Sequence, residues 1–108
     1  MSVSNQIMKG LLDGGILGLI SQGETYGYEI TKKLEAHKFP DISEGSIYPV
    51  LLRLSKKGYV NTRMVKSDSG GPKRKYYSIS DTGKAELKVF KDKWIKLNDG
   101  MNSLIRGE

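Results

Sequence analysis

Basic side chains are concentrated in one short stretch of this sequence, and their chemistry suits contact with a polyanion. Residues 53–75 contain eight Lys and Arg residues and one acidic residue. Residues 1–52 carry four cations and six anions, and residues 76–108 carry six cations and five anions. The net charge of +6 therefore arises in the middle of the chain. A solvated face kept for solubility would mix both signs, so we expect this stretch to bind a polyanion such as nucleic acid.

Four residues lie together on one face of a helix that the sequence predicts after Ser43. At about 100° per residue, one arc of this helix carries Ser46, Pro49, Arg53 and Lys56, and it faces away from the apolar residues Ile47, Leu51 and Leu54. An arginine on such a face can pair with guanine in the major groove of double-stranded DNA, and small residues allow close approach. For Arg53 and Lys56, an ordinary solvated face is the alternative.

A second basic group, Lys73-Arg74-Lys75, follows a cluster of turn-forming residues at positions 67–72. Alternation of side-chain type on either side of this cluster predicts strands over residues 60–65 and 76–79. The two strands would form a long hairpin with the basic group near its tip. There the cations could neutralise phosphates or enter a flanking minor groove.

Histidine and cysteine, which often carry out catalysis or bind metals, are scarce. The one histidine, His37, falls near the end of a predicted helix, where we expect a structural or solvated role. The absence of cysteine excludes disulfides, thiolate nucleophiles and zinc-thiolate sites. Gly70-Gly71-Pro72-Lys73 lacks the spacing of a phosphate-binding loop. We therefore expect no enzymatic activity, no cofactor and no metal.

Helices before the hairpin are needed to position these residues. Apolar spacings predict a first helix over residues 5–22, and Thr25 can cap a second helix that must stop before Pro40. Ser43 can cap the third helix, in which Pro49 predicts either a kink or a helix that becomes regular only after it. Three glycines in the first helix, at positions 14, 15 and 18, predict that another element approaches its backbone closely.

A last helix, opened by Ser80 or Thr82, shows the spacing of a coiled-coil seam. Apolar residues recur three and four positions apart, which predicts dimerisation through this face. Gly100 interrupts a seam of barely three heptads, so we expect the first helix to contribute to the interface as well. The predicted seam residues are Leu87, Phe90, Trp94, Leu97, Met101 and Leu104.

Length and composition fit one compact body. The chain has 108 residues, 37% of them hydrophobic, which is enough for one modest core. We predict an α+β, mainly α fold: a winged helix-turn-helix over residues 1–80 and a C-terminal dimerisation helix over residues 81–108. The most apolar stretch, residues 11–20, is too short to span a bilayer, and we expect a cytoplasmic protein with no membrane partner.

Four segments resemble, in the same order, the signatures of PadR-type transcriptional regulators. They are YGYEI at 26–30, EGSIYPVLLRL at 44–54, KGYV at 57–60 and RKYYSISDTG at 74–83. Each segment alone would be weak, but four in order are specific. The resemblance implies a winged-helix dimer that represses genes until a ligand or stress releases it.

By the same resemblance, Tyr26, Ser46, Tyr48 and Pro49 match positions on or beside the DNA-facing surface. The resemblance also assigns Arg74 and Lys75 to the wing, which is the hairpin formed by the two predicted strands. The two tyrosines have an alternative role, because half-buried tyrosines often only pack.

The last helix is short for this family and resembles the compact subgroup with a single C-terminal helix. In multidrug-sensing members of that subgroup, a tryptophan at the position of Trp94 stacks on flat aromatic compounds between the subunits. The resemblance thus implies a small aromatic effector bound by Trp94, with Phe90 as the other aromatic residue nearby. The alternative is that Trp94 is an apolar anchor of the dimer seam.

Taken together, the residues predict a sequence-specific repressor that binds double-stranded DNA as a homodimer. The main rival is a winged helix used only for protein contacts, since a fold alone does not determine function. The excess of positive charge between residues 53 and 75 favours DNA. Binding of RNA is less favoured, because no aromatic stacking platform is predicted on a sheet face.

Overall fold

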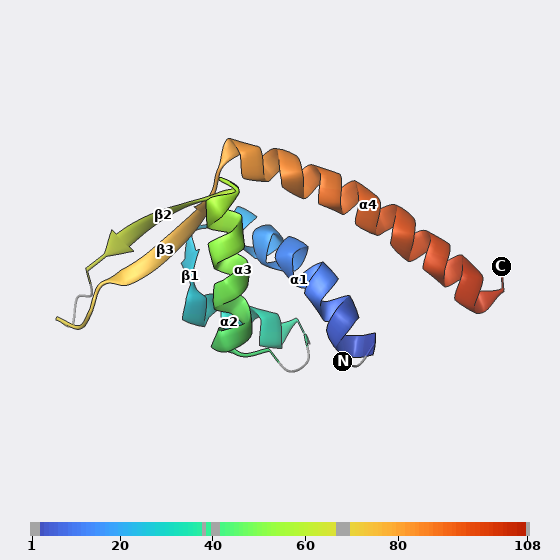
Figure 1. Cartoon of the computed structure of the whole chain (residues 1–108), viewed down its shortest axis with the longest axis horizontal. Coiled ribbons are helices and arrows are strands. Elements are labelled where there is room, and N and C mark those ends of the chain that lie inside the picture. Colours follow the sequence, from blue (N-terminus) through green and yellow to red (C-terminus); the bar gives the residue numbers. More distant parts are fainter. Residues whose placement is uncertain (1–2, 38, 40–41, 67–69, 108) are drawn as a thin grey trace.

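The computed structural model describes residues 3–37, 39, 42–66 and 70–107, with side chains from residue 11 onward. Within these residues the chain forms, in order, α1 (Val3–Ser21), β1 (Thr25–Tyr26), α2 (Gly27–Ala36), α3 (Glu44–Lys56), β2 (Val60–Val65), β3 (Arg74–Ile79) and α4 (Asp81–Arg106). Figure 1 shows α1, α2 and α3 packed together, the β2–β3 hairpin projecting to one side and α4 extending to the other. This order and arrangement confirm the predicted mainly helical winged-helix fold.

The core lies where the three N-terminal helices meet the base of the sheet. Apolar residues of α1, α2 and α3, such as Ile16, Ile30 and Ile47, are fully buried. The sheet contributes Val60 from β2 and Tyr77 from β3. This core holds α3 in place, so that its opposite face is free for a ligand.

Helix α3 begins as predicted but does not break at its proline. Ser43 is the N-cap residue with extended backbone, and the helix runs from Glu44 to Lys56 with Pro49 inside it. The expectation that the helix becomes regular only after Pro49 was therefore wrong. A proline removes one N–H, so the carbonyl four residues earlier, that of Gly45, loses its helical donor. Gly45 is exposed near the helix start, where water can replace that donor.

The sheet has a third strand that the sequence did not predict. Thr25 and Tyr26 form β1, which pairs antiparallel with β3 and gives the order β1-β3-β2. The prediction that Thr25 caps α2 was therefore wrong, because the N-cap residue is Tyr26. The fully buried Thr25 hydroxyl instead donates to Glu29 Oε1 at 2.6 Å, which lowers the pKa of that carboxyl.

Helix α4 packs only its first part against the rest of the chain. The Phe90 ring lies against Gly14 so closely that a Cβ at that glycine would be 2.2 Å from the ring, and Leu87 lies beside Gly18. The third glycine of α1, Gly15, faces the ring of Phe39. The predicted close approach to the glycines of α1 is thus confirmed.

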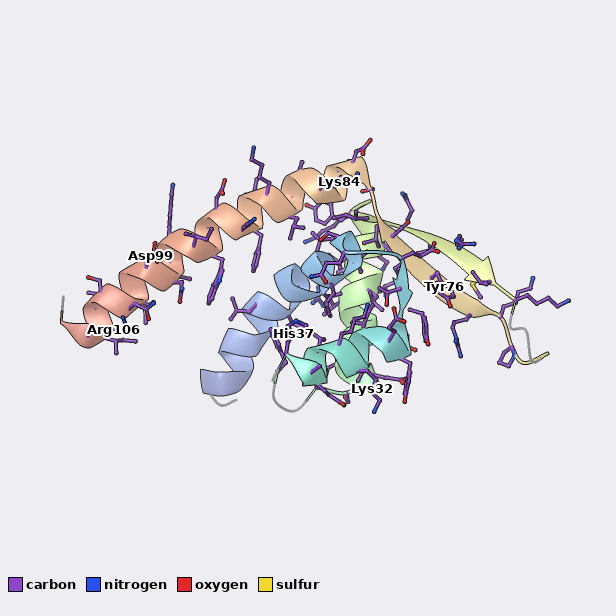
Figure 2. All side chains as sticks on the ribbon, turned by 180° about the vertical axis from the view of Figure 1, so that it is seen from behind. Lys32, His37, Tyr76, Lys84, Asp99 and Arg106 are labelled. Atoms are coloured by element: carbon purple, nitrogen blue, oxygen red, sulfur yellow. The ribbon has the colours of Figure 1, made fainter. Side chains whose placement is uncertain are left out.

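The C-terminal part of α4, which carries Asp99 and ends at Arg106, projects from the body (Figures 1 and 2). The helix begins at Asp81, which is where the sequence predicted the second domain to begin. The division into two domains itself stays a prediction. No helix in the described part of the chain is long and apolar enough to cross a membrane.

The start of α4 depends on a glycine. Ser80 caps the helix by accepting a hydrogen bond from the Gly83 N–H at 3.0 Å, and the Ser80 hydroxyl donates to the Gly58 carbonyl at 2.6 Å. This places Gly83 so close to the turn after α3 that a Cβ would lie 2.0 Å from the Tyr59 carbonyl oxygen. Because that neighbour is backbone, it cannot rotate away.

We expect Gly83→Ala to destabilise the protein by about 1–3 kcal/mol, the usual cost of overpacking. Gly100→Ala on the same helix is the matched control, because a Cβ there meets nothing within 4 Å. This control should be neutral or stabilising by up to about 1 kcal/mol, since alanine favours helix. Urea denaturation of the three proteins at equal concentration measures both effects. Equal midpoints for Gly83→Ala and wild type would contradict the packing described.

Candidate nucleic-acid interface

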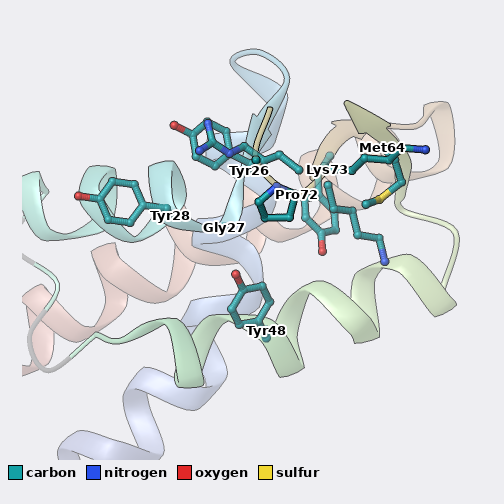
Figure 3. Close-up of a pocket in the computed structure, with 11 residues that line it drawn as sticks. Tyr26, Gly27, Tyr28, Tyr48, Met64, Pro72 and Lys73 are labelled. Atoms are coloured by element: carbon teal, nitrogen blue, oxygen red, sulfur yellow. The ribbon is translucent and has the colours of Figure 1, made fainter. Parts of the chain in front are cut away.

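A hollow of about 590 Å³ lies between the β2–β3 hairpin, the start of α2 and the exposed side of α3. We call it the wing hollow (Figure 3). Five of the predicted DNA-binding residues line it, although they come from three different elements and the loop before β3. They are Tyr26, Tyr48, Lys73, Arg74 and Lys75.

Strand β1 brings Tyr26 to the wing. Pairing of Tyr26 with Tyr76 across the sheet places their rings 5.2 Å apart, and the Arg74 guanidinium lies 4.3 Å from the centre of the Tyr26 ring. A cation over an aromatic face is attracted to it and keeps its charge. Tyr26 therefore orients one of the wing cations in addition to lining the hollow.

Tyr48 reaches the hollow from α3, four residues after the helix begins. Its side chain lies across Gly27, the first residue of α2, where a Cβ would be 2.9 Å from the Tyr48 hydroxyl oxygen. The residue is 49% exposed, and Figure 3 shows its hydroxyl turned toward Gly27 and the hollow. Gly27 thus makes room for Tyr48, whose role in DNA contact stays a prediction beside the alternative that it only packs.

Apart from Tyr48, the exposed face of α3 lies outside the wing hollow. Ser46, Pro49 and Lys56 are exposed there, as predicted. One residue that sequence reasoning missed shares this face: Leu52 is 56% exposed, although it is apolar. Its position opposite the buried stripe of α3 was the available signal.

Arg53, the predicted base reader, is held by a carboxylate from another helix. Its Nη2 lies 2.6 Å from Asp13 Oδ1 and its Nε lies 3.2 Å from Asp13 Oδ2, a two-point ion pair between α3 and α1. This hydrogen bonding to Asp13 raises the pKa of Arg53 above its ordinary value. Arg63 on β2 is held in the same way by Glu24, which lowers the pKa of that carboxyl. Base reading by Arg53 stays a prediction, and it would require the Asp13 pair to open.

Replacement of Asp13 by Asn separates the two possible roles of Arg53. If the pair positions α3, Asp13→Asn and Arg53→Ala should each weaken DNA binding several-fold, and the double variant should be no worse than Arg53→Ala. If Arg53 instead leaves Asp13 to contact DNA, Asp13→Asn should tighten binding because the competing carboxylate is gone. Fluorescence anisotropy with a labelled duplex measures the affinities. If both single variants bound DNA as tightly as wild type, both roles of Arg53 would be excluded.

The predicted dimer seam is divided in this structure. Leu87 and Phe90 pack against α1 of the same chain. The other four residues are exposed to between 40% and 79%: Trp94, Leu97, Met101 and Leu104. The seam as predicted is therefore partly used within the chain, and its remaining four residues form an uncovered apolar face.

His37 follows α2 and is exposed, with its Nδ1 2.7 Å from the Lys33 carbonyl oxygen (Figure 2). This is a helix-end contact. Among the described residues no cluster of three or more His, Cys, Asp or Glu could hold a metal ion.

Three packed helices, a small antiparallel sheet and a hairpin rich in cations define a winged helix-turn-helix protein. Residues 16–89 match the "Transcriptional regulator PadR-like family", and the chain belongs to this family. The family consists of transcriptional regulators, which confirms that the chain is not an enzyme.

Solved structures and relatives agree with this assignment. A PadR-like transcriptional regulator from Bacillus cereus strain ATCC 14579 is 48% identical, with a TM-score of 0.85 over 95% of this chain and 99% of that one. The negative transcriptional regulator PadR of Bacillus subtilis (strain 168) is 37% identical over 79 residues, 71% of this chain and 43% of that protein. The structure of Bacillus subtilis PadR in complex with operator DNA gives a TM-score of 0.68 at 32% identity, covering 74% of this chain and 46% of that one.

Proposed function

We propose that this chain is a transcriptional repressor that binds a specific double-stranded DNA operator as a homodimer. The observation that carries the proposal is the position of three wing cations, at residues 73–75, beside the exposed face of a helix that the core holds in place. The relative in the complex with operator DNA supports the same reading. A winged helix used only for protein contacts would have no need for this charge.

In this proposal α3 enters the major groove and the wing contacts the flanking backbone. Ser46, Pro49 and Lys56 lie on the exposed face that would meet base edges. Lys73 and Lys75 neutralise phosphates, and the Tyr26 and Tyr48 hydroxyls are donors to the same backbone. Hydrogen bonds to phosphate set the position of the protein, while contacts in the groove supply specificity.

The homodimer forms through the uncovered half of α4. A single chain leaves the apolar side chains of Trp94, Leu97, Met101 and Leu104 exposed along three turns, and a second copy would bury them. Two chains related by a two-fold axis would present two α3 helices to successive major grooves. Protection of two symmetric half-sites about 10 bp apart, in the DNA upstream of the chain's own gene, tests this proposal by hydroxyl-radical footprinting. Protection of a single half-site would contradict the dimer.

We propose that a flat aromatic effector binds at Trp94 and releases the protein from DNA. Trp94 is 40% exposed and lies one helical turn beyond Phe90. An indole in the seam is bulky, so the two helices would splay and leave an apolar slot. The ligand lowers DNA affinity only if it binds the DNA-free dimer more tightly than it binds the DNA-bound dimer.

Planar aromatic cations and phenolic acids should therefore quench the fluorescence of Trp94, the one tryptophan in the chain. Calorimetry with Trp94→Ala should show at least a tenfold loss of affinity for a compound that quenches. Binding that survives this substitution unchanged would leave Trp94 as a packing anchor.

A further inference from the structure

We propose that Leu52 determines operator specificity by contacting the C5-methyl group of a thymine in the major groove. This inference rests on the proposed function, since it requires α3 to enter DNA. Leu52 lies on α3 and is 56% exposed, whereas Leu51 and Leu54 beside it are buried. It is thus the one leucine of this helix that the core does not use.

The position of Leu52 on the helix places it between two residues that the proposed function assigns to DNA contact. Tyr48 precedes it by four residues and Lys56 follows it by four, so the three side chains lie in one row along the helix. Pro49, three residues before it, lies beside this row and is also exposed. A single exposed leucine on a protein surface needs no explanation. Here, however, it forms an apolar strip with Tyr48 and Pro49 on the surface that carries the wing cations at its edge.

Polar readers of bases are few on the same face. Arg53 would be the strongest, but its Nε and Nη2 already donate to Asp13, which leaves only part of the guanidinium for a base. In α3, which the structure describes from end to end, the other exposed polar groups on this face are the Ser46 and Tyr48 hydroxyls and the Lys56 amine. A helix that presents mainly apolar atoms to the major groove can distinguish thymine from the other bases, because thymine alone carries a methyl group there.

Burial of one methyl group on binding corresponds to about a fourfold gain in affinity. Thymine differs from uracil by this methyl group alone. Replacing the contacted thymine with deoxyuridine in one half-site should therefore weaken binding by about fourfold, and replacing it in both half-sites by about fifteenfold.

The experiment uses an operator selected from random duplex DNA with the full-length chain. Each thymine is replaced singly by deoxyuridine, and affinities are measured for wild type, Leu52→Ala and the control Val89→Ala, an exposed apolar residue of α4. We expect one thymine per half-site to show the fourfold loss with wild type and Val89→Ala, and no loss with Leu52→Ala. Since Leu52 is exposed, Leu52→Ala should keep the melting temperature of wild type.

Two results would overturn the assignment of Leu52. One is a deoxyuridine effect that persists in Leu52→Ala, because another residue would then read the methyl group. The other is an operator in which no thymine is sensitive, although the protein still prefers it over random DNA. Failure to select any preferred duplex would instead count against the proposed function itself.

Discussion

Simultaneous replacement of Lys73, Arg74 and Lys75 by alanine is expected to reduce DNA affinity by about a hundredfold or more at physiological salt. These three cations line the wing hollow, and none of them forms an ion pair with a carboxylate among the interactions of the described residues. Each phosphate neutralised by a protein cation contributes about 0.9 to the slope of log affinity against log salt. The variant should therefore also lose roughly three units of slope for each chain bound, or about five to six for the proposed dimer.

The matched control removes the same charge elsewhere. Lys91, Lys93 and Lys96 are exposed on α4, away from the wing, and their triple alanine variant should keep most of the affinity and of the slope. Anisotropy titrations over a series of salt concentrations compare the three proteins. Equal losses in the two triple variants would mean that net charge, and not the wing, determines binding.

Leu97→Asp is expected to dissociate the dimer at low micromolar concentration. Leu97 is 58% exposed in the single chain, at the middle of the uncovered apolar face of α4. Dimerisation would bury one unpaired carboxylate from each chain, and an uncompensated buried charge costs about 3–5 kcal/mol. The dissociation constant of the dimer should rise by at least a hundredfold.

Val89→Asp makes the same type of change on the same helix, at a residue that is 44% exposed and outside the heptad seam. It should leave the dimer intact. Sedimentation equilibrium reports the mass of each variant, and a full dimer of Leu97→Asp would place the interface elsewhere. Since two half-sites require two chains, Leu97→Asp should also lose most of its operator affinity.

Periodicity predicted those parts of the fold that are regular over several turns. The buried stripe of α3 and the approach of another element to the glycines of α1 follow from local spacing, and the structure confirms them. Of the two predicted openings of α4, Ser80 and Thr82, the structure shows Ser80. Strand β1 escaped prediction because two residues are too short to show an alternation. Its existence depends on β3, which lies about fifty residues further along the chain.

Contacts between distant residues were likewise out of reach of local patterns. Arg53 appeared as a free cation on an exposed face, because its partner Asp13 lies forty residues earlier on another helix. Phe90 appeared as a seam residue, because the heptad spacing does not distinguish packing on α1 from packing on a second chain. Leu52 could have been found from the helical wheel, where it is the leucine that falls opposite the buried stripe.

Competition between specific and random DNA tests the central claim most directly. A labelled duplex from upstream of the chain's own gene is bound by wild-type protein and displaced by unlabelled duplexes of the same length, either identical or scrambled. We expect two chains per duplex and a preference for the true sequence of about a thousandfold or more, with affinity that falls steeply as salt rises. Equal competition by the scrambled duplex, or binding that salt does not weaken, would contradict sequence-specific recognition by α3 and the wing.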